Sequence, residues 1–471
     1  MGRAARVAGA GAVALLLAVG GYGAADAADV VPGVLTLDPV PAPPRPFPTA
    51  PGAVGAPDPA AALSGLDPAA PLPAGDQVGA MVAELAADAR LGPSVGVVVA
   101  DQLTGEVLAA HQPDVPRIPA STAKLLTAVA ALSAIGPDAT VATRVVRGAD
   151  GEVVLVGGGD MLLAADAGDP AAVNGRAGLG DLARATAREL ALAGTTSVRV
   201  TVDDTLFTGP ALSPAWDPSH LANGFTAPVT ALAVDIAKVR TDVEYSPRQS
   251  DPVASAARAF ATALGAAGVA VEGTPTRGRA PEGTVQLAEV RSAPMVQIVD
   301  YFLHTSDNAI TEMVGRLVAI DAGLPASFDG ATQAVLAQSR ALGVDTTGAH
   351  LSDCSGLADG SALTVTTVLG LLRLVTDPAH PELRGVAVGM PVAGFSGTLA
   401  ERFTRSPAAG QVRAKTGSLS GVTSLAGTVV DADGRALLFS VVADQTPPGG
   451  QGAPRAAIDA FVARLAACGC R

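Results

Sequence analysis

Lysine is almost missing from this sequence. Only three of its 471 residues are lysine, whereas 28 are arginine, so arginine serves wherever a simple positive charge suffices. Arginine stays protonated in proteins, but a lysine amine can lose its proton and act as a base. Lys124, Lys238 and Lys415 are therefore the residues whose presence needs a chemical reason.

Positive charge as a whole is also scarce. The formal net charge is −13, and no basic run or interleaving of basic and aromatic residues occurs, which excludes nucleic acid as a partner. The glycine run at residues 157–160 lacks the Lys-Ser/Thr ending of a phosphate-binding loop, so we interpret it as a turn and predict no cofactor. Hydrophobic residues make up 49% of the chain, enough for a packed core.

The N-terminus lacks an apolar run of the roughly 20 residues that a membrane-spanning helix needs. Arg3 and Arg6 precede a shorter run from Val7 to about Gly20, and small residues follow up to Ala27. This pattern predicts a secretory signal peptide at residues 1–27 rather than an uncleaved anchor. Residues 28–75 are rich in proline and alanine, which is typical of an extended linker. We expect an exported protein associated with the cell wall or cell surface.

Cysteine is confined to Cys354, Cys468 and Cys470. A metal site is not predicted, because the C-terminal pair lacks a second ligand pair and the five histidines are scattered. In an exported protein we expect one disulfide, joining Cys354 to either Cys468 or Cys470 and so tying the tail to the folded body.

The two ends of the folded part have matching patterns. Near the N-terminal end, helical spacing at 76–88 is followed by strand-like runs at 94–100 and 106–110 and by an Ala/Leu-rich helix at 120–132. Near the C-terminus, strand-like runs at 411–416, 422–430 and 436–442 precede a helix at 455–467. These elements predict one α+β layer assembled from both termini. We assign residues 76–141 and 290–471 to this domain and residues 142–289, with helices at 179–193 and 253–268, to an inserted α/β region.

Ser121 and Lys124 lie three residues apart at the start of a predicted helix. This spacing places both side chains on one face, where the amine can take the hydroxyl proton and make the serine a nucleophile. The motif is short, but Ser306-Asp307-Asn308 and Lys415-Thr416-Gly417-Ser418 follow it in order. The three motifs together use two of the three lysines, which favours a catalytic site over unrelated turns and helix caps.

The expected roles follow from charge and hydrogen bonding. Lys415 should lower the pKa of Lys124 by like-charge repulsion, and Ser306 can pass a proton to a leaving amine. Asn308 offers a donor and an acceptor to a peptide substrate, while Lys415 and Thr416 can hold a substrate carboxylate. The backbone N–H groups of Ser121 and Ser418 are candidate oxyanion donors, and Gly417 lets the substrate approach the strand closely.

On these motifs the chain resembles the class C low-molecular-mass penicillin-binding proteins, the D-alanyl-D-alanine carboxypeptidase/endopeptidase family. The resemblance runs from about Asp76 to the C-terminus and includes Ala227-Pro228-Val229, Asp353-Cys354-Ser355-Gly356-Leu357 and Ser396-Gly397-Thr398-Leu399. It implies a penicillin-recognising serine transpeptidase-like fold, an antiparallel sheet with helices on both faces. It also implies an acyl-serine mechanism on the D-alanyl-D-alanine ends or D-alanyl cross-links of peptidoglycan stem peptides, inhibited covalently by β-lactams.

Two alternatives stay open at this point. A serine β-lactamase would need a dedicated deacylating glutamate, which no motif assigns, and a non-catalytic peptidoglycan-binding protein would not need intact Ser121, Lys124 and Lys415. Lys238 matches no motif, and we expect a surface or domain-packing role for it. Asp307 is expected to be solvated or to cap a helix.

Overall fold

The computed structural model describes residues 17–28, 30–31 and 67–469. The chain divides into two compact units, residues 1–64 and 65–471. In the first unit residues 17–27 are helical, while most of the predicted signal peptide and linker lies outside the described residues. Within the described ranges, no helix has the length and apolar character needed to cross a bilayer. The rest of this section concerns the second unit.

A five-stranded sheet joins the two ends of this unit. Its order is β11 (Val412–Leu419), β12 (Val422–Val430), β13 (Ala436–Ala443), β1 (Val95–Asp101) and β2 (Val107–His111). All neighbouring strands are antiparallel. The predicted α+β layer is therefore confirmed, and β11, which carries the Lys-Thr-Gly motif, forms one edge of the sheet.

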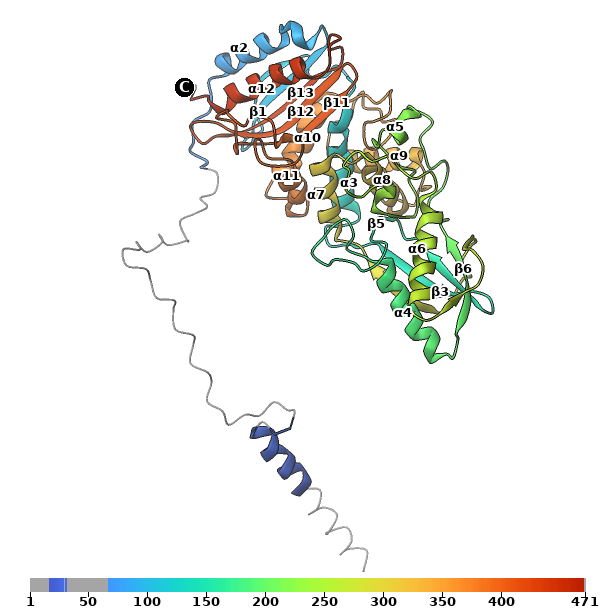
Figure 1. The fold of residues 1–471 in the computed structure, drawn as a ribbon. Helices are drawn as coiled ribbons and strands as arrows, with labels where there is room; N and C mark the ends of the chain where they lie inside the picture. Colours follow the sequence, from blue (N-terminus) through green and yellow to red (C-terminus); the bar gives the residue numbers. More distant parts are fainter. Residues whose placement is uncertain (1–16, 29, 32–66, 470–471) are drawn as a thin grey trace, which may run out of the picture. The chain divides into compact units, whose positions relative to one another are not determined.

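Helices cover both faces of this sheet because its strands are apolar on both sides. Val97 and Val99 of β1 pack with helices α2 (Gly75–Ala86) and α12 (Gly452–Ala466). Val98 and Ala100 face the opposite core, because successive side chains of a strand alternate. Burying each valine contributes roughly 1.5–3 kcal/mol. Figure 1 shows α2 and α12 on one side of the sheet and α10 (Val365–Thr376) on the other.

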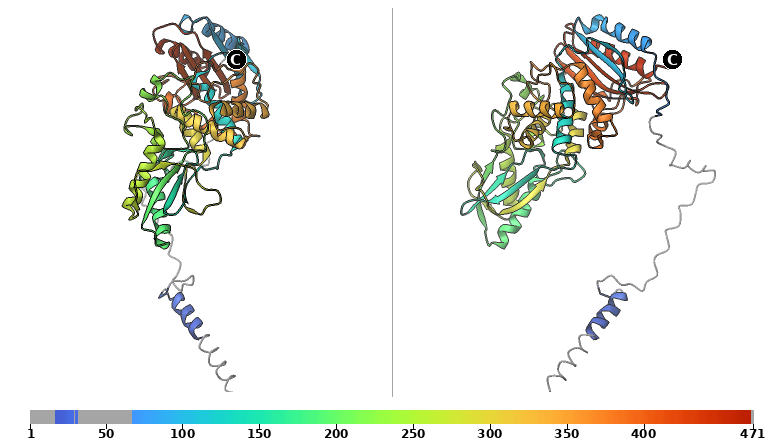
Figure 2. Two further views of the ribbon diagram at one scale, coloured as in Figure 1. Left: turned by 90° about the vertical axis from the view of Figure 1, so that its right-hand side faces the viewer. Right: turned by 180° about the vertical axis from the view of Figure 1, so that it is seen from behind.

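A helical layer lies on the α10 side. Besides α10 it contains α3 (Lys124–Ala134), α7 (Met295–Thr305), α8 (Asn308–Asp321), α9 (Phe328–Ala341) and the short α11 (Arg384–Gly389). Every residue of α3 from Lys124 to Leu132 is buried, as expected for a helix that is apolar on all faces. Figure 2 shows α3 side by side with the other helices of this layer. This burial fixes the position of Lys124 at the beginning of α3.

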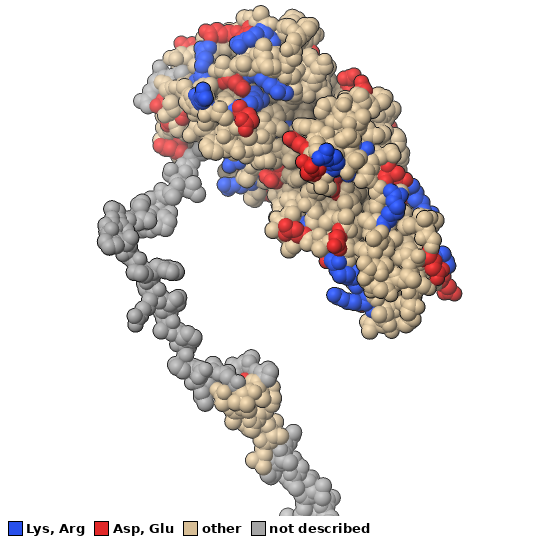
Figure 3. Space-filling model, viewed as in Figure 1, with Lys and Arg blue, Asp and Glu red and all other residues tan. Residues whose placement is uncertain are grey.

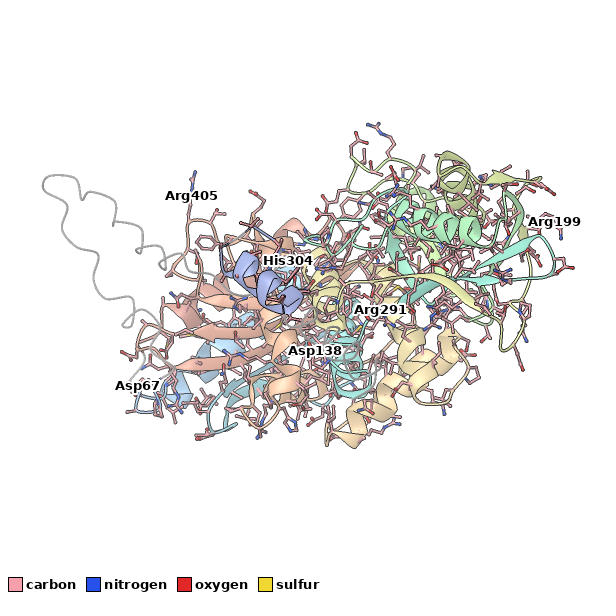
Figure 4. The ribbon with its side chains drawn as sticks, turned by 90° about the horizontal axis from the view of Figure 1, so that it is seen from below. Asp67, Asp138, Arg199, Arg291, His304 and Arg405 are labelled. Atoms are coloured by element: carbon pink, nitrogen blue, oxygen red, sulfur yellow. The ribbon has the colours of Figure 1, made fainter. Side chains whose placement is uncertain are left out.

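The middle of the chain builds a second, mixed sheet. Its order is β10 (Gln286–Arg291), β3 (Ala142–Arg147), β4 (Glu152–Val156), β6 (Ser197–Asp203) and β8 (Ala270–Val271), with β9 (Thr276–Arg277) also paired to β6. Helices α4 (Leu179–Leu192) and α6 (Pro252–Ala266) share its apolar core. Ala142 pairs with Arg291, so the chain leaves and re-enters the helical layer at one place. In Figure 4, Asp138 and Arg291 mark this place and Arg199 marks the far end.

The same segment also sends shorter elements toward the helical layer. They are a two-stranded parallel sheet of β5 (Asp160–Leu163) and β7 (Leu232–Val234), and the one-turn helix α5 (Ser219–Ala222). Acidic and basic side chains are interspersed on the face of the molecule shown in Figure 3.

The predicted helix at 120–132 begins differently from expected. Residues Ala120–Ala123 form a 3-10 turn, and the α-helix starts at Lys124. The Thr122 hydroxyl donates to the Pro119 carbonyl at 2.7 Å, and Ala120 has a positive φ of 48°. In a 3-10 turn, side chains three residues apart are eclipsed, which brings Ser121 and Lys124 closer in direction than an α-helix does.

The predicted disulfide of Cys354 is wrong. Cys354 is a free thiol with 0% exposure, packed so tightly on Gly315 that a Cβ there would lie 2.5 Å from its sulfur. Burial raises the pKa of this thiol. Cys468 is disulfide-bonded, but it belongs to the core on the opposite face of the sheet, so the sheet separates the two residues. Cys470 lies outside the described residues.

A buried ion pair anchors the beginning of the folded unit to the central sheet. Both Arg435 and Asp101 are nearly inaccessible, with side-chain exposures of 5% and 0%. Arg435 donates to both carboxylate oxygens at 2.6 and 2.7 Å. Its Nη1 donates to the carbonyls of Pro68 and Ala70. Four of the five guanidinium N–H groups thus have an acceptor.

We predict that Asp101→Ala lowers the free energy of unfolding by about 3–5 kcal/mol, because it leaves a buried guanidinium without its counter-charge. Urea unfolding followed by circular dichroism measures this change. Asp242→Ala, which removes the exposed partner of Arg240, should leave stability nearly unchanged. Equal effects of the two substitutions would contradict the prediction.

Candidate active site

Ser121 and Lys124 form a hydrogen-bonded pair. Lys124 Nζ lies 2.9 Å from Ser121 Oγ, while Ser121 remains partly exposed and Lys124 is 0% exposed. The predicted serine–lysine contact is therefore present, with the hydroxyl open to the outside and the amine behind it.

The Lys124 amine has two further acceptors. It donates to Asn308 Oδ1 at 2.6 Å and to the Ser355 carbonyl at 2.9 Å. The three acceptors come from the 3-10 turn, from α8 and from the loop before α10. An ammonium group has three N–H donors, so every donor of this buried side chain has a partner.

Burial is the main cause of a lowered pKa at Lys124. Loss of solvent reduces the pKa to about 8, although the nearby carboxylates of Asp353, Glu312 and Asp307 act in the opposite direction. Lys415 was expected to lower the pKa of Lys124 by like-charge repulsion, but burial is the cause instead. Like-charge repulsion acts instead on Lys415. Burial, and then the charge of Lys124, hold the pKa of Lys415 well below its ordinary value.

Lys415 pairs with the second serine of the motifs. Its Nζ donates to Ser306 Oγ at 2.9 Å and to the Thr416 carbonyl at 2.8 Å. Ser306 lies between α7 and α8 in a left-handed conformation with φ of 60°. Such a conformation costs a non-glycine residue about 1–2 kcal/mol, and the surrounding helices hold the hydroxyl beside Lys415.

The residues after Ser306 are held by α8. Asp307 caps this helix by accepting from the Ile310 N–H at 2.9 Å, as predicted. Asn308 bonds Lys124 through its oxygen and donates from Nδ2 to the Phe225 carbonyl at 2.8 Å. Asn308 thus joins the Lys124 amine to a loop of the middle segment, a role that the sequence did not indicate.

Glu312 and Asp353 are buried carboxyl groups at the site. The sequence analysis missed Glu312 and included Asp353 in the resemblance without a role. Glu312 lies one turn after Asn308 on α8 and accepts from the N–H groups of Cys354 and Ser355 at 3.1 and 2.7 Å. Burial, and then the charge of Asp353, raise the pKa of Glu312 to about 8. Glu312 follows Asn308 by four residues, and this spacing could have predicted that both side chains lie on the same face of a helix.

Asp353 fixes the loop from within. It accepts from the N–H groups of Gly356 at 2.6 Å and Ala358 at 2.7 Å. Its second oxygen also accepts from the Trp216 indole at 2.8 Å. Together, Glu312 and Asp353 set the position of the Ser355 carbonyl that receives Lys124.

Two glycines let the motifs pack closely. A Cβ at Gly356, which has a φ of +75°, would lie 2.0 Å from the Ala120 carbonyl. A Cβ at Gly417 would lie 2.1 Å from Ser424 Oγ and 2.9 Å from the Pro119 carbonyl. The glycine of the Lys-Thr-Gly motif therefore allows β11 to contact the turn before Ser121, in addition to the predicted access for a substrate.

A cleft of about 1360 Å³ opens in front of these residues. The motif residues in its wall are Ser121, Ser306, Asp307, Asn308, Thr416, Gly417 and Ser418. The middle segment contributes a second wall that includes Phe225, Lys238 and Tyr245. Lys238, for which a surface or packing role was expected, thus lines the same cleft as the three motifs.

The geometry suits acyl transfer. A partly exposed serine hydroxyl is bonded to a buried amine with a lowered pKa, and a second Ser–Lys pair lies beside it. The hydroxyls of Thr416 and Ser418 line the cleft at the edge strand. Groups of three side chains able to hold a metal ion do not occur in the described part of the chain.

This fold and site define a penicillin-recognising serine hydrolase. The structure is similar to penicillin binding protein 4 (dacB) from Haemophilus influenzae, with a TM-score of 0.66 and 22% identity, covering 82% of this chain and 98% of that chain.

The chain belongs to the D-Ala-D-Ala carboxypeptidase 3 (S13) family, whose model matches residues 78–249 and 240–467. It is 40% identical to Carboxypeptidase Rv3627c of Mycobacterium tuberculosis, covering 84% of this chain and 85% of that protein. It is 37% identical to Carboxypeptidase DacB of Mycolicibacterium smegmatis, covering 88% and 90%. The predicted family is confirmed.

We predict that Gly356→Ala lowers the free energy of unfolding by about 2–5 kcal/mol, from the positive φ and the overlap with the Ala120 carbonyl. Gly343→Ala is the control, because Gly343 has a φ of +81° and no neighbour within 4 Å of its added Cβ. It should cost only about 1–2 kcal/mol. Urea unfolding of both variants checks the difference, and equal losses would disprove the close packing.

Proposed function

We propose that this protein is an exported serine D,D-carboxypeptidase that acts on peptidoglycan stem peptides ending in D-Ala-D-Ala, with Ser121 as nucleophile and Lys124 as base. Membership of the S13 family supports the activity and the substrate class. The observation that carries the residue assignment is the 2.9 Å contact between Ser121 Oγ and a fully buried amine whose pKa is about 8.

In the first step Ser121 Oγ attacks the carbonyl carbon of the penultimate D-alanine, and its proton passes to the neutral Lys124 amine. The carbonyl oxygen becomes an oxyanion, for which the N–H groups of Ser121 and Ser418 are the proposed donors. When the C–N bond breaks, the terminal D-alanine leaves and its nitrogen needs a proton. The product is an acyl-serine.

Ser306 is the proposed proton donor to the leaving amine. Lys415 Nζ donates to Ser306 Oγ, so the hydroxyl proton of Ser306 is available for transfer to the leaving amine. Lys415 can then replace that proton on Ser306. The proton that Lys124 took from Ser121 then returns, through solvent, to the Ser306–Lys415 pair, which leaves Lys124 neutral again. A water molecule attacks the acyl-serine, Lys124 accepts the water proton and passes it to Ser121 Oγ, and the shortened peptide is released.

Substrate binding is assigned to the groups around the nucleophile. Asn308 is proposed to bond the peptide backbone with the donor and acceptor capacity that Lys124 and Phe225 leave unused. Thr416 and Ser418, with the positive charge of Lys415 behind them, are proposed to bind the terminal carboxylate. Gly417 keeps this strand free of a side chain where the substrate lies.

Neither alternative activity gains support from the site. A β-lactamase would need a base for rapid deacylation, but both oxygens of Glu312 bond backbone N–H groups and this residue does not line the cleft. A non-catalytic binding protein would not need the Ser121–Lys124 contact. β-Lactams are expected to acylate Ser121, and the similar Haemophilus influenzae protein has been solved in complex with a novel β-lactam.

We also propose that residues 1–27 direct export, that residues 28–75 form a linker, and that residues 142–289 form an inserted domain within the peptidase domain of residues 76–141 and 290–471. The inserted domain supplies Trp216 and Phe225, which bond Asp353 and Asn308. A structural role at the catalytic site is therefore one function of the insert.

We predict that the wild type releases D-alanine from a pentapeptide muropeptide and is labelled covalently by fluorescent penicillin, and that Ser121→Ala does neither because the nucleophilic oxygen is gone. Mass spectrometry of the muropeptide and of the intact protein measures both. Ser133→Ala, a change on α3 away from the cleft, is the matched control. Labelling of the Ser121→Ala variant would disprove the assignment.

The same mass spectra distinguish two activities on cross-linked material. Loss of a terminal D-alanine from a pentapeptide monomer is carboxypeptidase action, and conversion of a D-alanyl cross-linked dimer to monomers is endopeptidase action. Rapid turnover of a chromogenic cephalosporin instead of a lasting adduct would favour the β-lactamase alternative.

The acylation rate should rise with pH. Lys124 must be neutral to accept the Ser121 proton, so below its pKa of about 8 the reactive fraction grows about tenfold per pH unit, and above it the rate levels off. Stopped-flow measurement with fluorescent penicillin between pH 6 and 9.5 tests this. A rate that is constant or falling over this interval would rule out Lys124 as the base.

A further inference from the structure

Neither motif lysine presents its amine at the surface of the substrate cleft. Lys124 and Lys415 are both 0% exposed. Lys415 Nζ is occupied by Ser306 Oγ at 2.9 Å and by the Thr416 carbonyl at 2.8 Å. The groups of this motif that line the cleft are Thr416, Gly417 and Ser418, and none of these carries a charge. A substrate carboxylate placed there would need another cation for a direct ion pair.

Arg455 lies at this end of the cleft. It belongs to the first turn of α12 and lines the cleft together with Ser418. Its Nη2 donates to Ser418 Oγ at 2.9 Å. Gln451, just before α12, donates to the Leu419 carbonyl at 2.6 Å. The beginning of α12 is thus fastened to the end of β11, and the positive end of the helix dipole lies on the same side.

Arg455 forms no salt bridge within the described residues, and the charge of Asp459 acts on it only from a distance. Asp459, one turn further along α12, forms an ion pair with Arg402 instead. Partial loss of solvent and then the charge of Arg402 lower the pKa of Arg455, whose side chain is still exposed. A guanidinium nevertheless stays protonated at neutral pH. Two arginines therefore share one carboxylate, and the one beside Ser418 is free to act on an anion in the cleft.

The Arg455 contact also sets the direction of the Ser418 hydroxyl. A guanidinium donates hydrogen bonds and cannot accept them. Ser418 Oγ must therefore accept from Arg455, which leaves its own proton available to a second acceptor. A carboxylate is acceptor-only, whereas a carboxamide also presents N–H donors. The arrangement favours a free C-terminal carboxylate at this position.

We infer that Arg455 is a specificity-determining residue, which supplies the permanent positive charge for the terminal carboxylate of the substrate and orients the Ser418 hydroxyl toward it. This inference rests on the proposed function, because it takes Ser418 as part of the carboxylate site. It assigns to the C-terminal helix a part in substrate selection that the three motifs do not contain.

The test compares two substrates that differ only at the C-terminus, diacetyl-L-Lys-D-Ala-D-Ala and its C-terminal amide. For Arg455→Ala we expect the preference for the acid, as a ratio of kcat/KM values, to fall about tenfold, the lower end for a charge-assisted hydrogen bond because the side chain is open to solvent. The loss should appear as a raised KM for the acid, with the amide little changed. Arg455→Lys should restore part of the preference.

A second measurement uses benzylpenicillin and its methyl ester, with the rate of covalent labelling as readout. The preference of the wild type for the free acid should shrink in Arg455→Ala by a similar factor. Arg464→Ala removes an exposed arginine of the same helix, paired with Glu84, and should leave both preferences unchanged.

An unchanged preference in Arg455→Ala overturns the inference, and so does an equal loss on acid and amide, which would indicate a purely structural role. A wild type that acts on neither peptide and takes up no penicillin would instead refute the proposed function itself. The two failures are therefore distinguishable in one set of assays.

Discussion

The burial of one amine is the constraint on which the site depends. Removing a lysine ammonium from water is costly unless fixed acceptors replace the solvent, and the same loss of solvent brings the pKa of Lys124 to about 8. Ser121, Asn308 and Ser355 provide those acceptors from three parts of the fold. The 3-10 turn before α3, helix α8 and the loop before α10 must therefore all be in their native positions for the Lys124 amine to have its three acceptors.

A second set of groups holds these acceptors in place. Glu312 and Asp353 bind the backbone N–H groups of the loop around Ser355, and Trp216 and Phe225 attach the middle segment to the same network. Buried polar networks of this kind are rigid when every member has a partner. The middle segment therefore contributes to the order of the catalytic groups as well as to the wall of the cleft.

The two Ser–Lys pairs have different electrostatic situations. Lys124 is surrounded by carboxylates, which oppose the effect of burial on its pKa, whereas Lys415 has the Lys124 charge as a neighbour. Lys415 is accordingly better suited to handling a proton at Ser306 than to serving as a lasting cation for the substrate. This division explains why a separate arginine beside Ser418 is useful at the edge of the sheet.

The sequence by itself determined the three motifs, the α+β layer and the family, because these depend on local spacing and on apolar patterns that repeat along the chain. Tertiary packing decided two other features. One is the 3-10 turn at Ser121, and the other is the burial of Cys354 in the core on the opposite face of the sheet from Cys468. Sequence also left Glu312, Asp353 and Lys238 without a place in the site. Their positions depend on contacts between residues far apart in the chain, such as the 184 positions between Lys124 and Asn308. Spacing supplies a pair of reactive groups, but only the folded core removes the water that gives the amine its chemistry.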